Sequence, residues 1–446
     1  MRAIRQMLFL GVIAGSFAVA DELVIHVPNR LDGYKDSGCL EQKVASMRMY
    51  LGYWHQGLVG ASRKFAYDLR DCLQFDNLFD VELDALSSAP ATKEAITGLF
   101  SGGFDAALFI GYDGGDEKAV EWRLYDTRQG AMIAGRRLVI KGDEHEAVLA
   151  VAEMVVKGLM GEAPPFLSKI AFVEKKKGGR GAAVLSVIGV DGKGMRKIFE
   201  SSSPLVSPVW FPDGKKPFVI LSQFTRKNVS FVGVDMAGKR YPLHIVSTNA
   251  SKKKSGEGTY VGLSYGNSVA DVAFGRSGKI WRYHPATGAE QLNVGSFRVC
   301  ASPNLLPDGS IIFCADGKIY LFDVQEKKSR LLVGGGFCVG PSYTHSEQSV
   351  VFSKRVNRVM QLFLHNLRTG ETRQLTHDSG NKIDPSWSPC GQYVAFAWEQ
   401  GPRCRIGVLS IRSSQRKNPY WLVTPGNLCC ISPSWSPRFE GGLFLP

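Results

Sequence analysis

The spacing of hydrophobic residues divides the chain into two regions. Up to about residue 161, apolar residues recur at near-helical spacing within residues 58–75 and 144–160, and each segment predicts an amphipathic helix. Short apolar or alternating runs predict strands at residues 23–27, 104–112, 120–125 and 135–140. This mixture predicts a small α/β domain, which ends where the Gly- and Pro-containing residues 161–165 interrupt the pattern.

Beyond Pro165 the helical period is absent and a short motif repeats. In its clear form, a Pro is followed two residues later by Trp and then by a turn sequence, at residues 207–214, 384–391 and 432–437. Weaker copies lie at residues 302–309, 340–345 and 271–278. The copies recur about every 45 residues, the length of one four-stranded propeller blade. The pattern predicts an α+β protein of two domains, an α/β domain at residues 21–163 and a six-bladed β-propeller at residues 164–446.

The residue types of the motif have physical roles. The residue two positions after the Pro is expected to lie on a strand between neighbouring blades, and Pro-Asp-Gly is expected to turn the chain. Only thirteen residues follow Pro433, too few for another blade. The strands predicted at residues 169–173 and 184–190 are therefore expected to complete the last blade. Such a closure joins the two ends of the propeller and hides its sheet edges.

The first twenty residues predict export. Arg2 and Arg5 precede an apolar run at residues 7–17, and Ala18-Val19-Ala20 then offers an A-x-A cleavage site. The alternative, a membrane anchor, needs about twenty apolar residues, and no later segment reaches that length either. We predict a signal peptide at residues 1–20, cleaved after Ala20, and a mature protein without a membrane span.

The formal net charge of +13 raises the question of an anionic partner. Two lysine runs, at residues 175–177 and 252–254, could contact phosphates, but each falls between predicted strands beside Gly or Ser. Solvated loop tips are the favoured interpretation, and the export signal argues against nucleic acid as a partner. Attraction to anionic lipid headgroups remains compatible with these loops.

Cysteine and histidine show no metal-ligand spacing. The nine cysteines contain no C-x-x-C, and the eight histidines contain no H-E-x-x-H, so we predict no metal and no cofactor. His145 is expected to face solvent on its helix. Cys39 and Cys72 could form a disulfide in an oxidising compartment, and buried free thiols explain the same residues equally well.

One motif imitates a catalytic site. Residues 262–266 read G-x-S-x-G, the pattern of a hydrolase nucleophile elbow around Ser264. That elbow requires a strand-to-helix turn inside a full α/β domain, whereas this segment lies between blades with no helical pattern after it. We therefore interpret the motif as a chance match.

The repeat, the signal peptide and the preceding α/β domain together resemble the TolB family, periplasmic propeller proteins of the Tol-Pal system. The resemblance extends to the first domain, through residues 66–71, 103–111, 125–127 and 169–173 in the same order. It covers nearly all of the mature chain. The second and fourth copies depart from the family pattern because they lack the Trp and the Pro-Asp-Gly turn, and residues 21–29 match it poorly.

The resemblance implies a binding protein rather than an enzyme. Members of this family bind the peptidoglycan-associated lipoprotein Pal at one mouth of the propeller and contact TolA through the N-terminal segment. They serve outer-membrane integrity and constriction at cell division, and bacteriocins use the same mouth in some bacteria. The positions here that match the Pal contacts lead into each Pro of the repeat: Val206, Ser207, Ala270, Asp271, Ala301, Ser302, Val339, Gly340, Ile383, Asp384, Ile431 and Ser432.

Two other function classes compete with this interpretation. A secreted propeller-containing hydrolase or lyase needs an assembled acid/base pair or metal set at the channel, and the sequence shows neither. A propeller that binds a small ligand or glycan needs exposed aromatic side chains around the channel, which a sequence pattern does not reveal.

Overall fold

The structure is a computed structural model. It describes residues 47–438, except residues 57–58, 76–78, 91, 116–117, 177–180, 213–216, 226–228, 244–259, 266–270, 285–286 and 412–419. The predicted signal peptide with its cleavage site, the strand predicted at residues 23–27, Cys39 and the lysine run at residues 252–254 lie outside the described residues.

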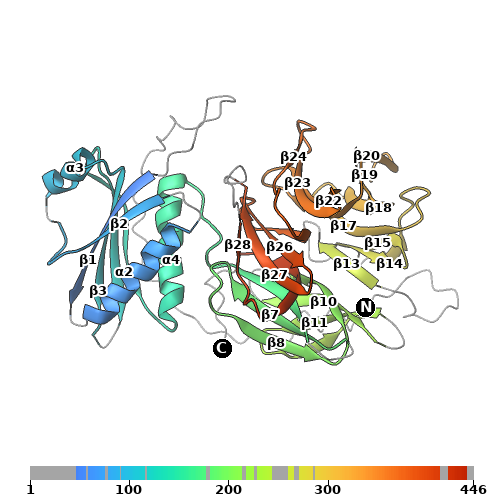
Figure 1. Cartoon of the computed structure of the whole chain (residues 1–446), viewed down its shortest axis with the longest axis horizontal. Coiled ribbons are helices and arrows are strands. Elements are labelled where there is room, and N and C mark those ends of the chain that lie inside the picture. The colour runs from blue at the N-terminus through green and yellow to red at the C-terminus, as the bar shows by residue number, and fades with distance from the viewer. Residues whose placement is uncertain are drawn as a thin grey trace. The chain divides into compact units, whose positions relative to one another are not determined.

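The first domain is built on a five-stranded mixed sheet in the order β2-β1-β3-β4-β5 (Figure 1). β1 (Met47–Gln56) lies between β2 and β3 and is parallel to both, and the last two strands are antiparallel. The other strands are β2 (Phe79–Ala85), β3 (Ala106–Asp113), β4 (Ala119–Asp126) and β5 (Ala131–Val139). Alternate residues of β3 face opposite cores: Leu108 packs with residues of α2 (Val59–Leu73) and α4 (Glu144–Met160), and Phe109 packs with Ile96 of α3 (Lys93–Ser101).

The strongly periodic segments of this domain form as predicted. α2 and α4 cover the two predicted helices, and β3 and β4 cover the predicted strands at residues 104–112 and 120–125. α4 begins at Glu144 because the Asp143 side chain accepts the His145 backbone N–H at 3.0 Å. It ends at Gly161, whose φ of 76° suits glycine. β5 begins at Ala131, earlier than the predicted residue 135.

One expectation for this domain is wrong. His145 does not face solvent freely, because its Nε2 lies 2.7 Å from Asp191 Oδ2 and its side chain is only 20% exposed. Asp191 belongs to the segment after β7 of the second domain. The helical pattern placed His145 correctly on α4, but it carried no information about what packs against that position.

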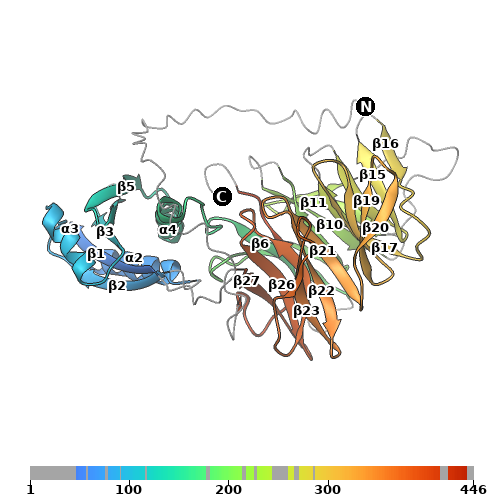
Figure 2. The ribbon, with the colours of Figure 1, turned by 90° about the horizontal axis from the view of Figure 1, so that it is seen from above.

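The second domain consists of antiparallel sheets in a propeller-like arrangement (Figure 2). Four sheets have four strands each, with every strand next to its sequence neighbour. They are β9 (Leu205–Trp210) to β12 (Arg240–Pro242), β13 (Tyr260–Tyr265) to β16 (Gly288–Gln291), β17 (Cys300–Leu305) to β20 (Lys328–Val333), and β21 (Cys338–Thr344) to β24 (Thr372–Gln374). The strands between these are β10 (Phe218–Phe224), β11 (Val229–Asp235), β14 (Val272–Arg276), β15 (Lys279–His284), β18 (Ile311–Ala315), β19 (Lys318–Asp323), β22 (Ser349–Val356) and β23 (Val359–Asn366).

The fifth sheet has eight strands and contains the closure of the domain. It joins β25 (Asn381–Trp387), β26 (Tyr393–Gln400), β27 (Arg403–Ser410) and β28 (Tyr420–Leu422) to β29 (Cys429–Trp435), β6 (Lys169–Lys175), β7 (Ala183–Gly189) and β8 (Arg196–Ser201). β29 pairs antiparallel with β6, so the predicted closure by the early strands is confirmed. Among the described residues, the strands of the two halves pair at a single backbone position, where Cys404 of β27 lies opposite Cys429 of β29.

Hydrophobic cores lie between neighbouring sheets, as a propeller requires. Trp210 of β9 packs with Leu185 of β7, and Trp387 of β25 packs with Val351 of β22. Each of these pairs joins two different sheets, so the aromatic residue two positions after the Pro holds adjacent blades together, as predicted. Within the described ranges, no helix has the length and apolar character needed to cross a bilayer.

Candidate partner-binding site on the first strands

The first strands of successive sheets form a closed ring. β9, β13, β17, β21, β25 and β29 contact one another in that order, and β29 contacts β9. Each strand shifts its register against its second-strand partner at one position, which marks a β-bulge. The bulges therefore lie at equivalent positions around the ring.

A residue with left-handed backbone conformation occupies every bulge. The φ values are 50° at Ser207, 64° at Gly262, 50° at Ser302, 60° at Gly340, 53° at Asp384 and 50° at Ser432. A non-glycine residue in this region carries a conformational cost of about 1–2 kcal/mol. Four of the six positions carry that cost in the native state, so the surrounding sheet holds them rigidly.

The structure corrects one of the predicted copies of the motif. Residues 272–276 form β14, the second strand of its sheet, and Asp271 lies immediately before it. The Asp271 carboxylate forms an ion pair with Arg282, with 2.7 Å between Oδ2 and Nη2, and Ala270 lies outside the described residues. The bulge of this sheet is at Gly262 instead. Residues 262–265 read Gly-Leu-Ser-Tyr and match the Gly-Pro-Ser-Tyr of residues 340–343, with Leu in the place of Pro.

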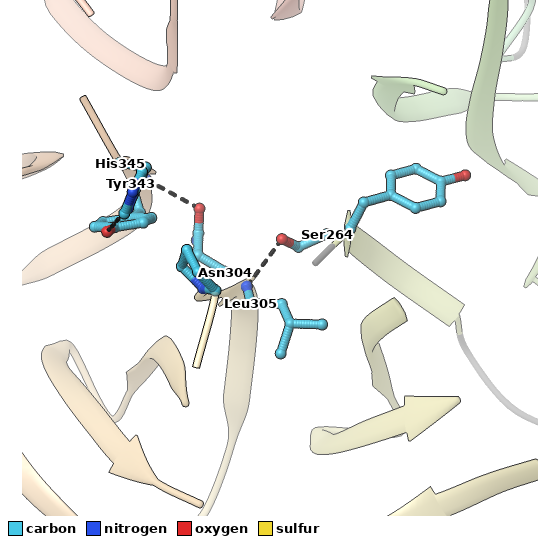
Figure 3. A pocket seen from close by; sticks show the side chains of 7 residues that line it. Ser264, Asn304, Leu305, Tyr343 and His345 are labelled. Atoms are coloured by element: carbon cyan, nitrogen blue, oxygen red, sulfur yellow. Dashed lines mark hydrogen bonds between the residues drawn. The ribbon is translucent and has the colours of Figure 1, made fainter. Parts of the chain in front are cut away.

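The G-x-S-x-G motif thus belongs to the repeat, and Ser264 has a structural role. Its Oγ accepts a hydrogen bond from the Leu305 backbone N–H of the next first strand at 3.0 Å (Figure 3). Asn304 Oδ1 accepts the Tyr343 N–H at 3.1 Å in the same way, and Ser386 Oγ accepts the Trp435 N–H at 2.9 Å. The side chain two positions after the bulge therefore ties each of these strands to the following one.

Two of the three motif tryptophans donate a hydrogen bond to the preceding first strand. Trp387 Nε1 donates to the Ser342 carbonyl at 2.9 Å, and Trp210 Nε1 donates to the Ser434 carbonyl at 3.0 Å. Trp435 Nε1 donates to Ser168 Oγ at 2.6 Å. Because each indole is almost fully buried and its N–H is satisfied, the Trp387 and Trp210 contacts fix the spacing between blades, whereas the Trp435 contact lies within its own sheet, beside β6.

Asp384 and Ser432 connect two neighbouring bulges. Ser432 Oγ donates to Asp384 Oδ2 at 3.1 Å. The Asp384 side chain is exposed to solvent. Desolvation raises the pKa of Asp384, and the Ser432 hydrogen bond and the charge of Lys175 only partly oppose that rise.

The structure brings ten of the twelve predicted site residues to equivalent places in the ring. Ala301 and Asp384 are exposed, and Ser432 is buried. The remaining seven are half-buried: Val206, Ser207, Ser302, Val339, Gly340, Ile383 and Ile431. Gly262 is the member that sequence reasoning missed, and the signal that could have identified it is the alignment of Gly-Leu-Ser-Tyr with Gly-Pro-Ser-Tyr.

A pocket of about 220 Å³ lies beside the ring and tests the hydrolase alternative. It is lined by Ser264, Tyr265, Asn304, Leu305, Pro307, Tyr343 and His345 (Figure 3). His345 Nδ1 lies 3.3 Å from the Tyr343 hydroxyl, and the lining contains no carboxylate to orient the imidazole. Since Ser264 already accepts the Leu305 N–H, the pocket lacks the Ser-His-Asp geometry of a nucleophilic site. Within the described ranges, His, Cys, Asp and Glu form no group of three that could hold a metal ion.

The fold defines a β-propeller-like protein with an α/β domain at its N-terminal side. Comparison with curated proteins confirms the resemblance to TolB. The chain is 32% identical to the Tol-Pal system protein TolB of Dechloromonas aromatica over 127 residues, which are 28% of each protein. It is 28% identical to TolB of Aromatoleum aromaticum over 179 residues, 39% of this chain and 41% of the relative.

These matches span well under two thirds of the relatives, and no family model matches the chain. The fold likeness extends much further. The crystal structure of TolB from Acinetobacter baumannii superposes with a TM-score of 0.74 at 18% identity, over 88% of this chain and 97% of that one. The α/β domain followed by the propeller-like domain is thus a shared architecture.

Proposed function

We propose that this chain is a periplasmic, non-enzymatic scaffold component of the Tol-Pal system. It binds the Pal lipoprotein at the propeller mouth and links inner-membrane Tol proteins to the outer membrane, with TolA contacting its N-terminal region. Its roles are outer-membrane integrity and constriction during division, with bacteriocin import in some bacteria. The predicted signal peptide, cleaved after Ala20, supports the periplasmic location.

We further propose that the propeller has six blades, with the domain boundary near residue 163. The eight-stranded sheet supports this count because, among the described residues, its two halves are joined by strand pairing at a single backbone position, Cys404 opposite Cys429. Each half then has the four strands of the separate sheets. The six first strands in the ring give the same number.

The ring of rigid bulges is the observation that carries the proposed binding role. It presents the exposed Ala301 and Asp384 on strands that are tied to their neighbours by buried tryptophans and side-chain hydrogen bonds. A preorganised surface of this kind binds a protein partner without first losing conformational freedom. The similarity to TolB relatives indicates which partner to test.

The test is capture of envelope proteins from crosslinked cells that carry the tagged chain. The wild-type chain is expected to recover a Pal-like lipoprotein, and Ser302→Arg and Asp384→Arg are expected to lose it. Glu326→Arg is a matched control because Glu326 is exposed at the turn between β19 and β20 and its substitution changes the charge as Asp384→Arg does. If the folded wild-type chain recovers no lipoprotein, the proposed function is wrong.

A further inference from the structure

Positive charge is concentrated at one end of the sheets β13–β16, β17–β20 and β21–β24. Five segments lie at this end, the hairpins at residues 276–279, 316–318 and 354–359 and the connections at residues 293–299 and 334–338. Together they contain seven Lys or Arg residues and one carboxylate, Asp316. The connection into β25 at residues 375–380 lies at the same end and adds the carboxylate of Asp378, which forms an ion pair with Lys382. The turns at the opposite end, at residues 306–310, 323–328, 345–349 and 366–372, contain three cations and five carboxylates. Charge is therefore segregated between the two ends.

Backbone contacts join these segments into one surface. The Cys300 N–H donates to the Gly278 carbonyl at 2.8 Å, and the Cys338 N–H donates to the Gly317 carbonyl at 2.8 Å. The Arg355 N–H donates to the Phe337 carbonyl at 2.9 Å. We call this surface the cationic patch; its charged members used below are Lys279, Arg298, Lys318, Lys354, Arg355 and Arg358.

Asp316 does not neutralise the patch by pairing with a cationic side chain. Asp316 accepts the backbone N–H groups of Arg298 and Val299 at 3.2 and 3.3 Å. Lys279 Nζ donates to the Phe297 carbonyl at 3.0 Å, which leaves its charge without a counterion in that contact. Among the described residues, the six cations take part in no ion pair with a carboxylate.

Two large apolar side chains stand exposed within the patch. Val299 is 52% exposed and Phe337 is 45% exposed. The Arg355 guanidinium carbon lies 5.0 Å from the centre of the Phe337 ring, so the aromatic side chain is presented beside a cation. Exposed aromatic and Arg side chains in one place are typical of the energetic centre of a protein interface.

The patch is continuous with the ring of bulges. Val299 lies two residues before Ala301 of β17, and Phe337 lies two residues before Val339 of β21. A protein that covers these ring positions therefore also reaches the patch. This continuity favours a protein over a lipid surface as the occupant, since two side chains bury little apolar area in a bilayer.

We propose that the cationic patch binds an acidic protein segment that carries at least one apolar side chain. This inference rests on the proposed function only in taking the occupant to be the protein bound at the ring. Complementary charge at this end would speed and orient docking, and salt would weaken it. Phe337 and Val299 would be covered by the apolar side chain of the partner.

A defined probe tests the patch directly. The probe is a fluorescent 12-residue peptide that has glutamate at alternate positions and contains two phenylalanines. Fluorescence anisotropy measures its binding to the purified full chain. The double variant Arg298→Glu and Arg355→Glu is expected to bind at least about tenfold more weakly, and Phe337→Ala is expected to weaken binding as well. A peptide with Gln in place of Glu is expected to lose most of the binding.

The control double variant is Lys328→Glu and Arg368→Glu, which makes the same charge change at exposed residues of the opposite end. If it weakens peptide binding as much as the patch variant does, the proposal is wrong because only net charge matters. Binding of phosphatidylglycerol vesicles through the same residues, without peptide binding, would also overturn it. Circular dichroism of each variant checks that the chain is folded.

The envelope capture separates this proposal from the proposed function. Loss of the lipoprotein with the patch variant, but not with its control, supports both. Capture of the lipoprotein at wild-type level by the patch variant contradicts the patch and leaves the proposed function intact. Patch-dependent peptide binding without any captured lipoprotein contradicts the proposed function and retains the patch.

Discussion

The first strands β25 and β13 reach the same geometry with different residues. β25 carries Asp-Pro-Ser-Trp at residues 384–387, and β13 carries Gly-Leu-Ser-Tyr at residues 262–265. Both begin this segment with a left-handed residue at a bulge, at φ values of 53° and 64°. In both, the serine accepts a backbone N–H from the next first strand, at 2.9 Å from Trp435 and 3.0 Å from Leu305.

The two strands differ in the aromatic residue and in the residue that occupies the bulge. Trp387 is almost fully buried and donates to the preceding strand, whereas Tyr265 is half-buried and packs its ring 5.6 Å from Phe211. Gly262 adopts the left-handed conformation at no steric cost, whereas Asp384 adopts the same conformation at a steric cost. The bulge and the serine are thus common to both, and the Pro and the Trp add stability without defining the geometry.

The largest expected effect is at the tryptophan. Trp387→Ala removes a buried ring and its hydrogen bond to Ser342, and is expected to lower the free energy of unfolding by about 3–5 kcal/mol. Trp387→Phe keeps most of the packing and is expected to cost much less. Calorimetric unfolding of the purified chain measures both. Equal costs for the two variants would show that the hydrogen bond, and not the packing, holds the blades.

A smaller effect is expected where β13 uses glycine. Gly262→Ala places a Cβ no closer than 3.7 Å to Pro303, so its expected cost of about 1–2 kcal/mol comes from the positive φ alone. Ser302→Gly at the equivalent bulge is expected to stabilise the chain, because it removes the same cost. The same calorimetric measurement applies, and destabilisation by both variants would contradict the equivalence of the two positions.

The serine hydrogen bond is expected to contribute equally to both strands. Ser264→Ala and Ser386→Ala each leave a backbone N–H without its acceptor, at an expected cost of about 1–2 kcal/mol. Chemical denaturation compares the two variants under one condition. A neutral Ser264→Ala beside a costly Ser386→Ala would show that β13 is held mainly by Tyr265 packing.

The smallest effect is a pH dependence confined to β25. Because desolvation by nearby protein atoms raises the pKa of Asp384, the folded state binds more protons than the unfolded state above the ordinary value of 3.8. Stability is therefore lost as pH rises from that value through the higher folded-state pKa. Asp384→Asn is expected to remove this loss, so the variant gains in Tm at neutral pH and shows no gain below about pH 4. Unchanged Tm differences across this range would contradict the direction of the shift.

Hydrophobic periodicity predicted the helices and strands that bury one face and leave the other more exposed. α2 and α4 are amphipathic, and β4 alternates between buried and half-buried residues, so each shows its period in the sequence. The pattern does not predict β1, the strand between β2 and β3. It pairs in parallel with β2 and β3, which lie far from it along the chain, and its residues follow no clean alternation.

The residues of the candidate site likewise divide into those that a local sequence pattern predicts and one that it does not. Ser207, Ser302, Gly340, Asp384 and Ser432 were identified because a Pro follows each of them, and this local sequence accompanies the bulge wherever it occurs. Gly262 lacks that Pro, and Asp271 was chosen in its place because the strand after it has the apolar pattern of the motif. Only the pairing of β13 with β14 shows which of the two strands lies in the ring.

The sequence by itself determined the repeat, its length and the closure by early strands, because these follow from residue spacing and chain length. The tertiary structure alone decided which strand of each sheet lies in the ring, and that His145 meets Asp191. It also decided that the G-x-S-x-G serine bonds to a neighbouring strand, and that dispersed Lys and Arg residues gather at one end. These features depend on pairing between residues distant in sequence, and the spacing of residues along one segment contains no information about its partner.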